Sequence, residues 1–550
     1  MDIVKIKIND EVKEYKRDIT LEEISKEYKE KFENPILTAT VNNRLTTLNT
    51  KVSKDCEVTF YDISHYKGNL VYEKGLCFIF AKAVKDILNC DVKIMHTIDN
   101  GIYCEILTNN LISEVTTEKI KIRMRELTEE AISITKIMVS RTDAIDYYTK
   151  INQMDKAESL RYISNSSISL YKMNDSLDYF YGVLPINTKF IDKYNLKYLK
   201  DNKVVLTYPV LYDKKGSLKF EKNDKEISVI EKNDEYLNAL EINTSVDLNK
   251  VISTGNYGDV IRISELLQNN NLLDIADKIS KDKDIKVILI AGPSSSGKTT
   301  TSRKLSLFLK SKGLKPIPVS IDDFFIDTKD RELNEKGEPE KEKITVVDTN
   351  QFNKKILDLL NGKEVFMPKF NFVEGKQQLS SKSTKLEEKS VLVVEGIHAF
   401  NEELTEMIPD KNKFKIFICP MTPLNIDNHN LFKSTDNRLL RRIIRDNMHR
   451  GCSASVTLEM WKDVRKAEEE YVLPYDKDAD VIFNTSLAYE LGVLKTYAEP
   501  LLFSVSEDDP NYDEAIRLIN LFRVILGIPS EEVPNDSIIR EFIGGSCFKD

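Results

Sequence analysis

Short apolar runs and helical stripes recur along the chain, and no stretch approaches the roughly 18 apolar residues of a membrane span. The continuous run Val287–Ala291 predicts a buried strand, and the apolar stripe within Thr300–Lys312 predicts a helix soon after it. Three further runs predict buried strands in the same half of the chain: Ile317–Ser320, Val391–Val394 and Phe414–Ile418. Buried strands separated by helices are typical of a parallel α/β sheet.

A phosphate-binding motif lies between the first of these strands and its helix. Residues 292–299 read G-P-S-S-S-G-K-T, a complete G-x-x-x-x-G-K-[ST] sequence. Backbone N–H groups of such a loop converge on phosphate oxygens at the positive end of a helix. We expect Lys298 to reach the β- and γ-phosphates and the Thr299 hydroxyl to ligate Mg²⁺. The residues predicted to bind a nucleotide here are Gly292, Pro293, Ser294, Ser295, Ser296, Gly297, Lys298, Thr299 and Thr300.

Carboxylates follow two of these predicted strands. The segment 320–325 reads S-I-D-D-F-F, and Glu395 closes the strand at 391–394. Because parallel strands present ligands at their carboxyl ends, these carboxylates should face the γ-phosphate. Both segments resemble the uridine kinase family, with its S-x-D-x-F-[YF] and V-x-x-E-G sequences. The resemblance implies that Asp322 is the catalytic base, with Asp323 left open, and that Thr299, Glu395 and Asp322 form the metal site.

A basic amphipathic helix is predicted over 437–451, with apolar positions at 440, 444 and 448. It is interpreted as a lid that closes guanidinium groups against the transferring phosphoryl group, with a solvated charged face as the alternative. Uridine kinases carry a similar R-R-x-x-R-D…R-G segment. That resemblance implies that Arg442 contacts the acceptor ribose and that Arg445 and Arg450 contact the triphosphate. The expected catalytic set is Asp322, Lys298, Arg442 and Arg445.

The acceptor site departs from the family. Uridine kinases read the base with a tyrosine and a histidine in P-x-Y-x-F-x-x-H, whereas residues 368–375 here read P-K-F-N-F-V-E-G. Phe370 and Gly375 replace the two polar readers, so pyrimidine selectivity does not carry over, since apolar shape discriminates weakly. The family's ribose-binding aspartate falls near Glu342, in a Lys/Glu-rich segment that also fits a charged surface. The residues expected at the acceptor are Asp322, Phe325, Glu342, Phe370, Phe372 and Arg442.

The first residues form a separate pattern. Val4, Ile6 and Ile8 alternate with lysines, which predicts a strand over 3–8, and residues 20–23 form a capping box that opens a short helix. Further strands are predicted at 36–41 and 58–61. Residues 1–62 therefore predict a compact ββαββ module. It resembles the TGS domain, a ubiquitin-like β-grasp fold at the front of threonyl-tRNA synthetases.

The next region, residues 63–244, continues this resemblance. The helical stretch Leu76–Leu88 followed by 96–103 (H-T-I-D-N-G-I-Y) resembles the second additional domain of the same synthetases. Those editing domains carry an H-x-x-x-H pair on the first helix, and here no histidine is present in 72–88. We therefore expect neither zinc nor editing chemistry. His65 and His96 are isolated and are interpreted as structural residues.

Residues 245–284 predict short helices and are interpreted as a helical linker. A phosphate-loop domain is predicted over 285–505, and a tail over 506–550 is expected to pack on it through a helix at 512–526. The predicted fold class is a multidomain α/β and α+β chain. It combines an N-terminal β-grasp module, an α+β synthetase-like domain and a C-terminal parallel α/β kinase domain.

The composition and net charge limit the kinds of binding partner that we expect. A net charge of −9 argues against a dominant nucleic-acid-binding surface. The seven cysteines are scattered without a C-x-x-C pair, which favours reduced thiols over a disulfide framework. The N-terminus lacks a basic start followed by an apolar core. We expect a soluble cytoplasmic protein with no membrane partner.

The predicted function is that of a nucleoside kinase that uses ATP and Mg²⁺ and transfers the γ-phosphoryl group to a nucleoside 5′-hydroxyl. One alternative is an RNA- or ribosome-associated regulatory ATPase that uses the synthetase-like half. Another is a kinase of a non-nucleoside hydroxyl compound, as in phosphoribulokinase-like or pantothenate kinase-like enzymes. RNA binding through the TGS-like domain and homo-oligomerisation are left open, as are the acceptor base and the choice between ATP and GTP.

Overall fold

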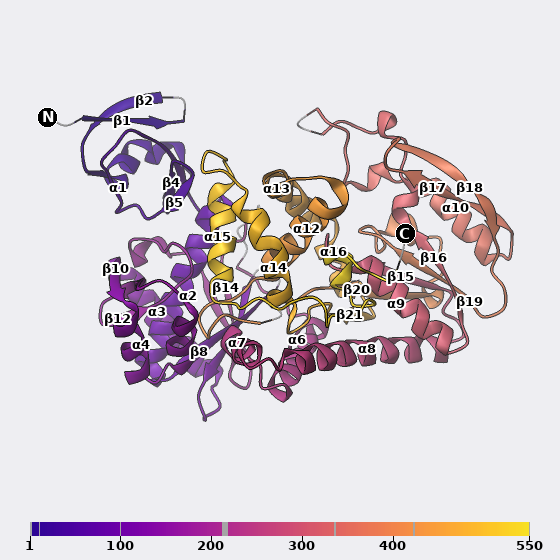
Figure 1. Ribbon diagram of the computed structural model, residues 1–550, viewed down its shortest axis with the longest axis horizontal. Coiled ribbons are helices and arrows are strands. Elements are labelled where there is room, and N and C mark those ends of the chain that lie inside the picture. The colour runs from indigo at the N-terminus through magenta and orange to yellow at the C-terminus, as the bar shows by residue number, and fades with distance from the viewer. Residues whose placement is uncertain are drawn as a thin grey trace.

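The computed structural model describes residues 3–9, 11–98, 101–211, 218–334, 337–421 and 424–548. A small β unit lies at one end of the long axis, a parallel sheet lies toward the other end, and helices fill the space between them (Figure 1). Short 3-10 turns lie at Lys26–Lys31, Leu160–Tyr162, Thr188–Phe190, Ile321–Phe324, Thr328–Asp330, Ile344–Val346, Asp410–Asn412 and Leu473–Asp478.

The N-terminal unit is a five-stranded sheet in the order β2-β1-β7-β4-β5, in which β1 and β7 are parallel. Val4, Ile6 and Ile8 point into its core, as the alternation predicts. The capping box at Thr20 and Glu23 is present. The elements are β1 Ile3–Ile8, β2 Glu11–Lys16, β3 Ile19–Thr20, α1 Leu21–Ser25, β4 Thr38–Val41, β5 Arg44–Thr46, β6 Lys51–Val52 and β7 Cys56–Tyr61.

A second unit packs the long helix α2 on an antiparallel sheet in the order β13-β14-β9-β8. Helix α2 begins ten residues before the stretch that the sequence indicated, because His65 accepts a hydrogen bond from the Lys67 amide and caps it. Its elements are α2 Tyr66–Leu88, β8 Asp91–Ile98, β9 Gly101–Leu107, α3 Glu114–Glu129, β10 Ile134–Ser140, α4 Arg141–Lys150, α5 Met154–Ser159, β11 Ser167–Met173, β12 Ser176–Asp178, β13 Asn195–Lys200 and β14 Lys203–Thr207.

A five-stranded parallel sheet in the order β16-β19-β15-β20-β21 carries the phosphate-binding motif. Its central strand β15 is buried on both faces: Val287 and Leu289 join one apolar cluster, and Ile288 and Ile290 join another. The elements are β15 Val287–Ala291, α9 Lys298–Ser311, β16 Lys315–Ser320, α10 Thr349–Leu360, β17 Val365–Asn371, β18 Lys376–Thr384, β19 Ser390–Glu395, α11 Glu402–Thr405, β20 Lys413–Ile418 and β21 Val481–Phe483.

The segment before this sheet forms three helices, α6 Asp224–Ala239, α7 Ser245–Ser253 and α8 Tyr257–Lys281. Helix α8 is one of the walls of the sheet's core, because Leu272 and Ile279 cluster with Leu305 and Leu309 of α9. The sequence analysis interpreted 245–284 as a helical linker. In the structure the apolar stripe of α8 is buried against the sheet domain, whereas Leu248 of α7 is buried in a separate apolar cluster.

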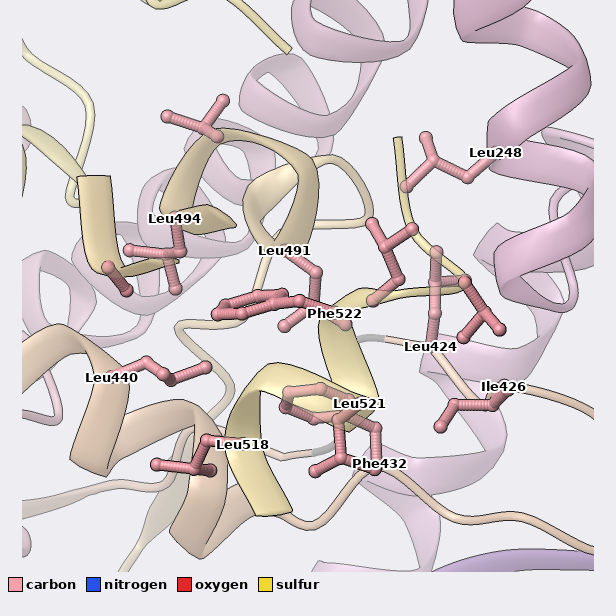
Figure 2. Close-up of a cluster of buried hydrophobic side chains, with 14 of the residues drawn as sticks. Leu248, Leu424, Ile426, Phe432, Leu440, Leu491, Leu494, Leu518, Leu521 and Phe522 are labelled. Carbon is pink, nitrogen blue, oxygen red and sulfur yellow. The ribbon is translucent and has the colours of Figure 1, made fainter. Parts of the chain in front are cut away.

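A helical core joins the two halves of the chain (Figure 2). Leu518 and Phe522 of α15 pack beside Leu440 of α12, Leu491 of α14 and Leu248 of α7. The helices are α12 Ser434–Arg450, α13 Ala454–Tyr471, α14 Glu490–Phe503, α15 Tyr512–Phe522 and α16 Arg540–Ile543. Across the described residues, no helix is long and apolar enough to span a membrane.

Candidate functional site

The loop between β15 and α9 has the backbone that a phosphate-binding turn requires. Gly297 adopts a left-handed φ of +88°, and a Cβ at this position would lie 2.6 Å from the Ile538 Cγ2 atom of the C-terminal segment. Only glycine meets both demands without strain. Ser295 is also left-handed, with a φ of 57°. Glycine at 297 thus leaves room for Ile538, a residue far away in sequence that packs against the loop.

Lys298 folds back onto its own loop. Its Nζ atom donates to the carbonyl oxygens of Gly292 at 2.8 Å and of Pro293 at 2.9 Å. Burial lowers the pKa of Lys298, and nearby Glu395 and Asp322 oppose that shift. The Thr299 hydroxyl makes no hydrogen bond to any described residue, so it is available to a ligand. Both side chains therefore fit the roles that the sequence predicts for them.

Strand register brings two carboxylates to this loop. Glu395 is the parallel partner of both Ile290 on β15 and Ser320 on β16, so three strands end together. Burial raises the pKa of Asp322, and Lys298 opposes the rise. Burial and the charge of Asp322 raise the pKa of Glu395 to about 7. Two carboxylates that disfavour each other's charge fit a divalent cation, which would relieve that repulsion.

Asp322 and Asp323 have different surroundings. The Asp323 Oδ1 atom accepts a hydrogen bond from the Phe370 amide at 3.2 Å, which ties the turn after β16 to the hairpin β17–β18. The Asp322 carboxylate accepts no hydrogen bond from any described residue, and its charged neighbours include Lys298, Arg450 and Arg331. Asp322 is therefore the carboxylate with unused acceptor capacity beside the phosphate loop.

Helix α12 presents arginines to the loop from a buried position. Arg442 Nη1 donates to the Ser294 hydroxyl at 2.8 Å, and Arg438 Nη1 donates to the Ser294 carbonyl at 3.2 Å. Arg441 is fully buried and pairs with Glu490 of α14. The helix also contributes Leu440 to the core between the halves, so its packing differs from that of the surface lid expected from the sequence. Met448, expected on the apolar face, is 46% exposed.

Arg445 and Arg450 flank a buried carboxylate. Asp446 is fully buried and contacts Arg442 at 3.2 Å, Arg445 at 3.7 Å and Arg450 at 3.2 Å. Burial lowers the pKa of Arg445 to about 10. The side chain of Arg450 is 53% exposed, so it can reorient toward a ligand with little loss of packing.

Aromatic rings cluster where the hairpin β17–β18 meets the turn after β16. Phe370 contacts Phe325 edge to face at 5.8 Å and Phe372 at 5.1 Å, measured between ring centroids. Phe325 and Phe370 are buried, whereas Phe372 is 67% exposed. The Arg331 guanidinium lies 4.9 Å from the Phe325 ring centre and 5.2 Å from that of Phe370. This aromatic cluster is next to a cation that the sequence analysis missed.

Glu342, from another segment, lies among the charged groups around the phosphate loop. Burial raises its pKa, and its charged neighbours are Arg442, Glu468, Asp322 and Lys298. The structure therefore brings Glu342 to the phosphate-loop side of the sheet rather than to an exposed, purely solvated surface. Its carbonyl oxygen lies 2.8 Å from His398 Nε2.

Gly375, the position expected to carry the family's base-reading histidine, is a turn residue. Its φ is +63°, and a Cβ there would lie 2.6 Å from the Thr328 hydroxyl oxygen. The residue directly precedes β18, so it serves the hairpin turn. A histidine at this position would strain the turn, which explains in backbone terms why the polar reader is absent.

Several site residues were missed by sequence reasoning. The Glu468 Oε1 atom accepts from the Ser294 amide at 2.7 Å and from Arg438, and Glu541 contacts Thr300. Neither lies in a motif with a known spacing to the loop. The only signal for Glu541 was an R-E-F-I-G-G run, whose apolar and glycine residues are unusual in a solvated tail.

In the synthetase-like half, helix α2 carries no histidine, and lysine and cysteine side chains are found there instead. Lys82 pairs with Asp86 and Asp175, each within 2.8 Å. Burial lowers the pKa of Lys74 to about 8 and raises that of Cys77 to about 12. His96 lies 3.8 Å from Asp234. In the part of the chain that the structure describes, no cluster of three or more His, Cys, Asp or Glu side chains is placed to hold a metal ion.

Comparison with known proteins addresses both halves. Residues 287–489 match the Phosphoribulokinase / Uridine kinase family. This segment is a domain of that family. A uridine kinase of Ligilactobacillus salivarius is 28% identical over 197 residues, which is 36% of this chain and 83% of that protein.

The other half is similar to part of a different enzyme. The threonine–tRNA ligase of Carboxydothermus hydrogenoformans is 25% identical over 190 residues, which is 34% of this chain and 30% of the ligase. The chain thus spans under a third of the ligases it matches, and it joins a synthetase-like N-terminal part to the kinase-family domain. Among solved structures, a possible uridine kinase from Bacillus stearothermophilus aligns at 17% identity with a TM-score of 0.27, covering 39% of this chain and 98% of that one.

Proposed function

We propose that the protein is an ATP-dependent phosphotransferase that phosphorylates a hydroxyl group of a small molecule, with a nucleoside 5′-hydroxyl as the leading acceptor. The observation that supports it best is the meeting of Lys298, Asp322 and Glu395 at one edge of the parallel sheet. A nucleotide-binding loop alone would be equally consistent with a regulatory ATPase that acts as a switch. A partly buried carboxylate beside it, with no hydrogen-bond partner among the described residues, is the added group that hydroxyl activation requires.

In the proposed reaction the acceptor hydroxyl oxygen attacks the γ-phosphorus of ATP, and ADP leaves. Asp322 orients the hydroxyl and accepts its proton as the new O–P bond forms. Its raised pKa keeps its basicity closer to neutral pH, which suits a general base. Lys298 turns from the loop carbonyls to the β- and γ-phosphate oxygens, and Arg442 is close enough to the loop to offset developing charge.

Mg²⁺ fits the residues at the end of β19. Thr299, Glu395 and Asp322 would hold it, and it would supply charge neutralisation of the phosphates. Asp322 would therefore serve both in this set and as the base. The nucleotide-binding residues in this proposal are those of the loop, with Arg445 and Arg450 as contacts to the triphosphate.

For the acceptor pocket we propose Phe325, Phe370, Arg442 and Glu342. One of these rings would stack on a flat base while the other meets it edge-on, and Glu342 with Arg442 would bind ribose hydroxyls. The more exposed Phe372 would cover the acceptor from the solvent side. Because the rings carry no hydrogen-bonding groups, we expect broad selectivity among nucleobases.

The experiment that tests the proposal is an acceptor panel. Purified full-length protein is incubated with ATP and Mg²⁺ and with uridine, cytidine, adenosine, guanosine, ribulose 5-phosphate, pantothenate or no acceptor, and ADP release is followed. Acceptor-dependent ADP together with the phosphorylated product, detected by mass spectrometry, supports the proposal. Acceptor-independent ADP release that RNA stimulates would favour the regulatory ATPase instead.

A further inference from the structure

The C-terminal segment places a carboxylate on the phosphate loop. The Glu541 Oε2 atom accepts two hydrogen bonds from Thr300, one from its amide at 3.2 Å and one from its hydroxyl at 2.8 Å. Thr300 is in the first turn of α9, where backbone N–H groups are free to bind an anion. Glu541 lies outside the family-matched residues 287–489, so the contact is an addition by this chain.

A second cationic group faces the same carboxylate. Arg445 Nη1 lies 4.0 Å from Glu541 Oε1. Thr300 and Arg445 were both predicted from the sequence to contact the nucleotide phosphates, and both are engaged by Glu541. A carboxylate with a backbone amide, a hydroxyl and a guanidinium around it has the surroundings of a bound phosphate.

The segment that carries Glu541 is firmly anchored. Ile538 and Phe542 are fully buried in the cluster that contains α9 and β15, and Phe542 lies under the Arg441 guanidinium at 5.1 Å. Two main-chain oxygens, of Ser530 and Val533, accept from Arg540 at 2.7 Å. Release of the loop therefore needs rotation of one side chain and not detachment of the whole tail.

The simplest role for Glu541 is to cap the N-terminus of α9. The N-cap residue Gly297 has no side chain to cap the helix, so a carboxylate from elsewhere would stabilise the helix end. Capping alone, however, does not account for the second carboxylate oxygen. Glu541 Oε1 lies 4.0 Å from the Arg445 guanidinium, which is not part of α9, while Oε2 accepts from the Thr300 hydroxyl at 2.8 Å.

We propose that Glu541 is an internal competitor of the nucleotide: its carboxylate occupies the phosphate-binding groups of Thr300 and Arg445, and a bound triphosphate displaces it. The inference rests on the nucleotide-binding part of the proposed function and not on the acceptor. Since like charges at this range repel in a partly buried site, Glu541 lowers the affinity for the nucleotide and lowers it most for the metal-free anion.

Calorimetric titration of the full-length protein tests this inference. ATP is titrated, with and without Mg²⁺, into the wild type, Glu541→Gln and Glu541→Ala, with Glu531→Gln as the matched control, an exposed carboxylate of the same segment. We expect Glu541→Ala to lower the Kd for metal-free ATP by at least about fivefold, Glu541→Gln to lower it by less, and both to have smaller effects on Mg-ATP. Glu531→Gln should match the wild type.

A Kd for metal-free ATP that is unchanged or higher in both Glu541 variants overturns the inference, provided near-UV circular dichroism shows a native fold. Selective loss of Mg-ATP affinity would instead make Glu541 a metal contact and would also overturn it. If no variant binds ATP, the inference fails together with the nucleotide site. If ATP binds more tightly to the variants but no acceptor is phosphorylated, the inference stands and the proposed reaction fails.

Discussion

The Phe370 amide donates a hydrogen bond to Asp323 at 3.2 Å, and this bond separates the roles of two adjacent carboxylates. It commits Asp323 to holding the hairpin β17–β18 against the turn after β16. Asp322 is left facing Lys298. The sequence motif alone left the choice between them open, and this contact favours Asp322 as the base.

Substitution of Asp322 should therefore affect the transfer step, and substitution of Asp323 should affect the position of the hairpin. Asp322→Asn should leave the Kd for ATP nearly unchanged and lower kcat by at least about 10²-fold, the usual scale for a positioned base. Asp323→Asn should act mainly on the acceptor KM, because the hairpin carries Phe370. Steady-state kinetics of both variants check this, and a larger kcat loss for Asp323→Asn would move the base by one residue.

A buried ionic cluster joins the halves of the chain and predicts a pH dependence. His429 Nδ1 lies 2.6 Å from Asp178, and its Nε2 lies 2.7 Å from Asp91. Burial and the Lys156 ammonium, 2.6 Å from Nδ1, lower the pKa of His429, but the two carboxylates outweigh them and raise the pKa from 6.5 to about 10. Its contribution to stability is therefore complete below pH 6.5 and is lost as the pH rises to 10.

Urea unfolding between pH 6.5 and 10 measures this contribution. The wild-type free energy of unfolding should fall by up to about 1.4 kcal/mol per pH unit more steeply than that of His429→Gln. His449→Gln serves as the control, since His449 is an exposed residue of α12. Equal slopes for the wild type and His429→Gln would mean that the imidazolium is not what joins Asp91 and Asp178.

Arg441 is predicted to be structural. It is fully buried and paired with Glu490, which is fully buried as well. Arg441→Met should lower the free energy of unfolding by about 3–5 kcal/mol because it strands a buried carboxylate, and adding Glu490→Leu should recover much of the loss. Arg450→Ala on the same helix should cost less than about 1 kcal/mol, since Arg450 is half exposed and Arg442 and Arg445 still contact its partner Asp446. A double variant as unstable as the single one would contradict this account.

The hairpin turn can be tested at Gly375. Gly375→Ala meets both a left-handed φ of +63° and a contact of 2.6 Å with Thr328, whereas Gly313→Ala meets a φ of +81° with nothing within 4 Å. Both should lower the Tm through backbone strain of about 1–2 kcal/mol. Only Gly375→Ala should also raise the acceptor KM, because it displaces the strand that carries Phe370. Equal acceptor KM values for the two variants would mean that the hairpin does not contribute to the acceptor site.

The features that local sequence encodes were predictable. The loop at 292–299, the strands before Asp322 and Glu395 and the capping box at Thr20 all rest on short-range pattern. The position of these carboxylates at one edge of the sheet then follows, because parallel strands end at a common edge. The burial of Arg441 could not be read from its helix, whose charged face looks the same whether it meets solvent or Glu490.

Contacts between distant segments were beyond sequence reasoning. Glu468 on α13 and Glu541 in the tail reach the loop only because the helical core folds both back onto it. Likewise, the polar residues scattered through 245–284 are typical of a linker, and only the packing against α9 shows that α8 is a core helix. The role of Gly375 required its φ, which no one-dimensional pattern supplies.

The central claim is that Asp322 and the phosphate loop transfer a phosphoryl group to a hydroxyl acceptor. Its most direct test is single-turnover transfer from γ-labelled ATP with the best acceptor of the panel, comparing the wild type with Asp322→Asn. The account predicts label in the acceptor product with the wild type, at least about 10²-fold slower transfer with the variant, and unchanged ATP binding in both. Label released only as inorganic phosphate, at equal rates in both proteins, would contradict it.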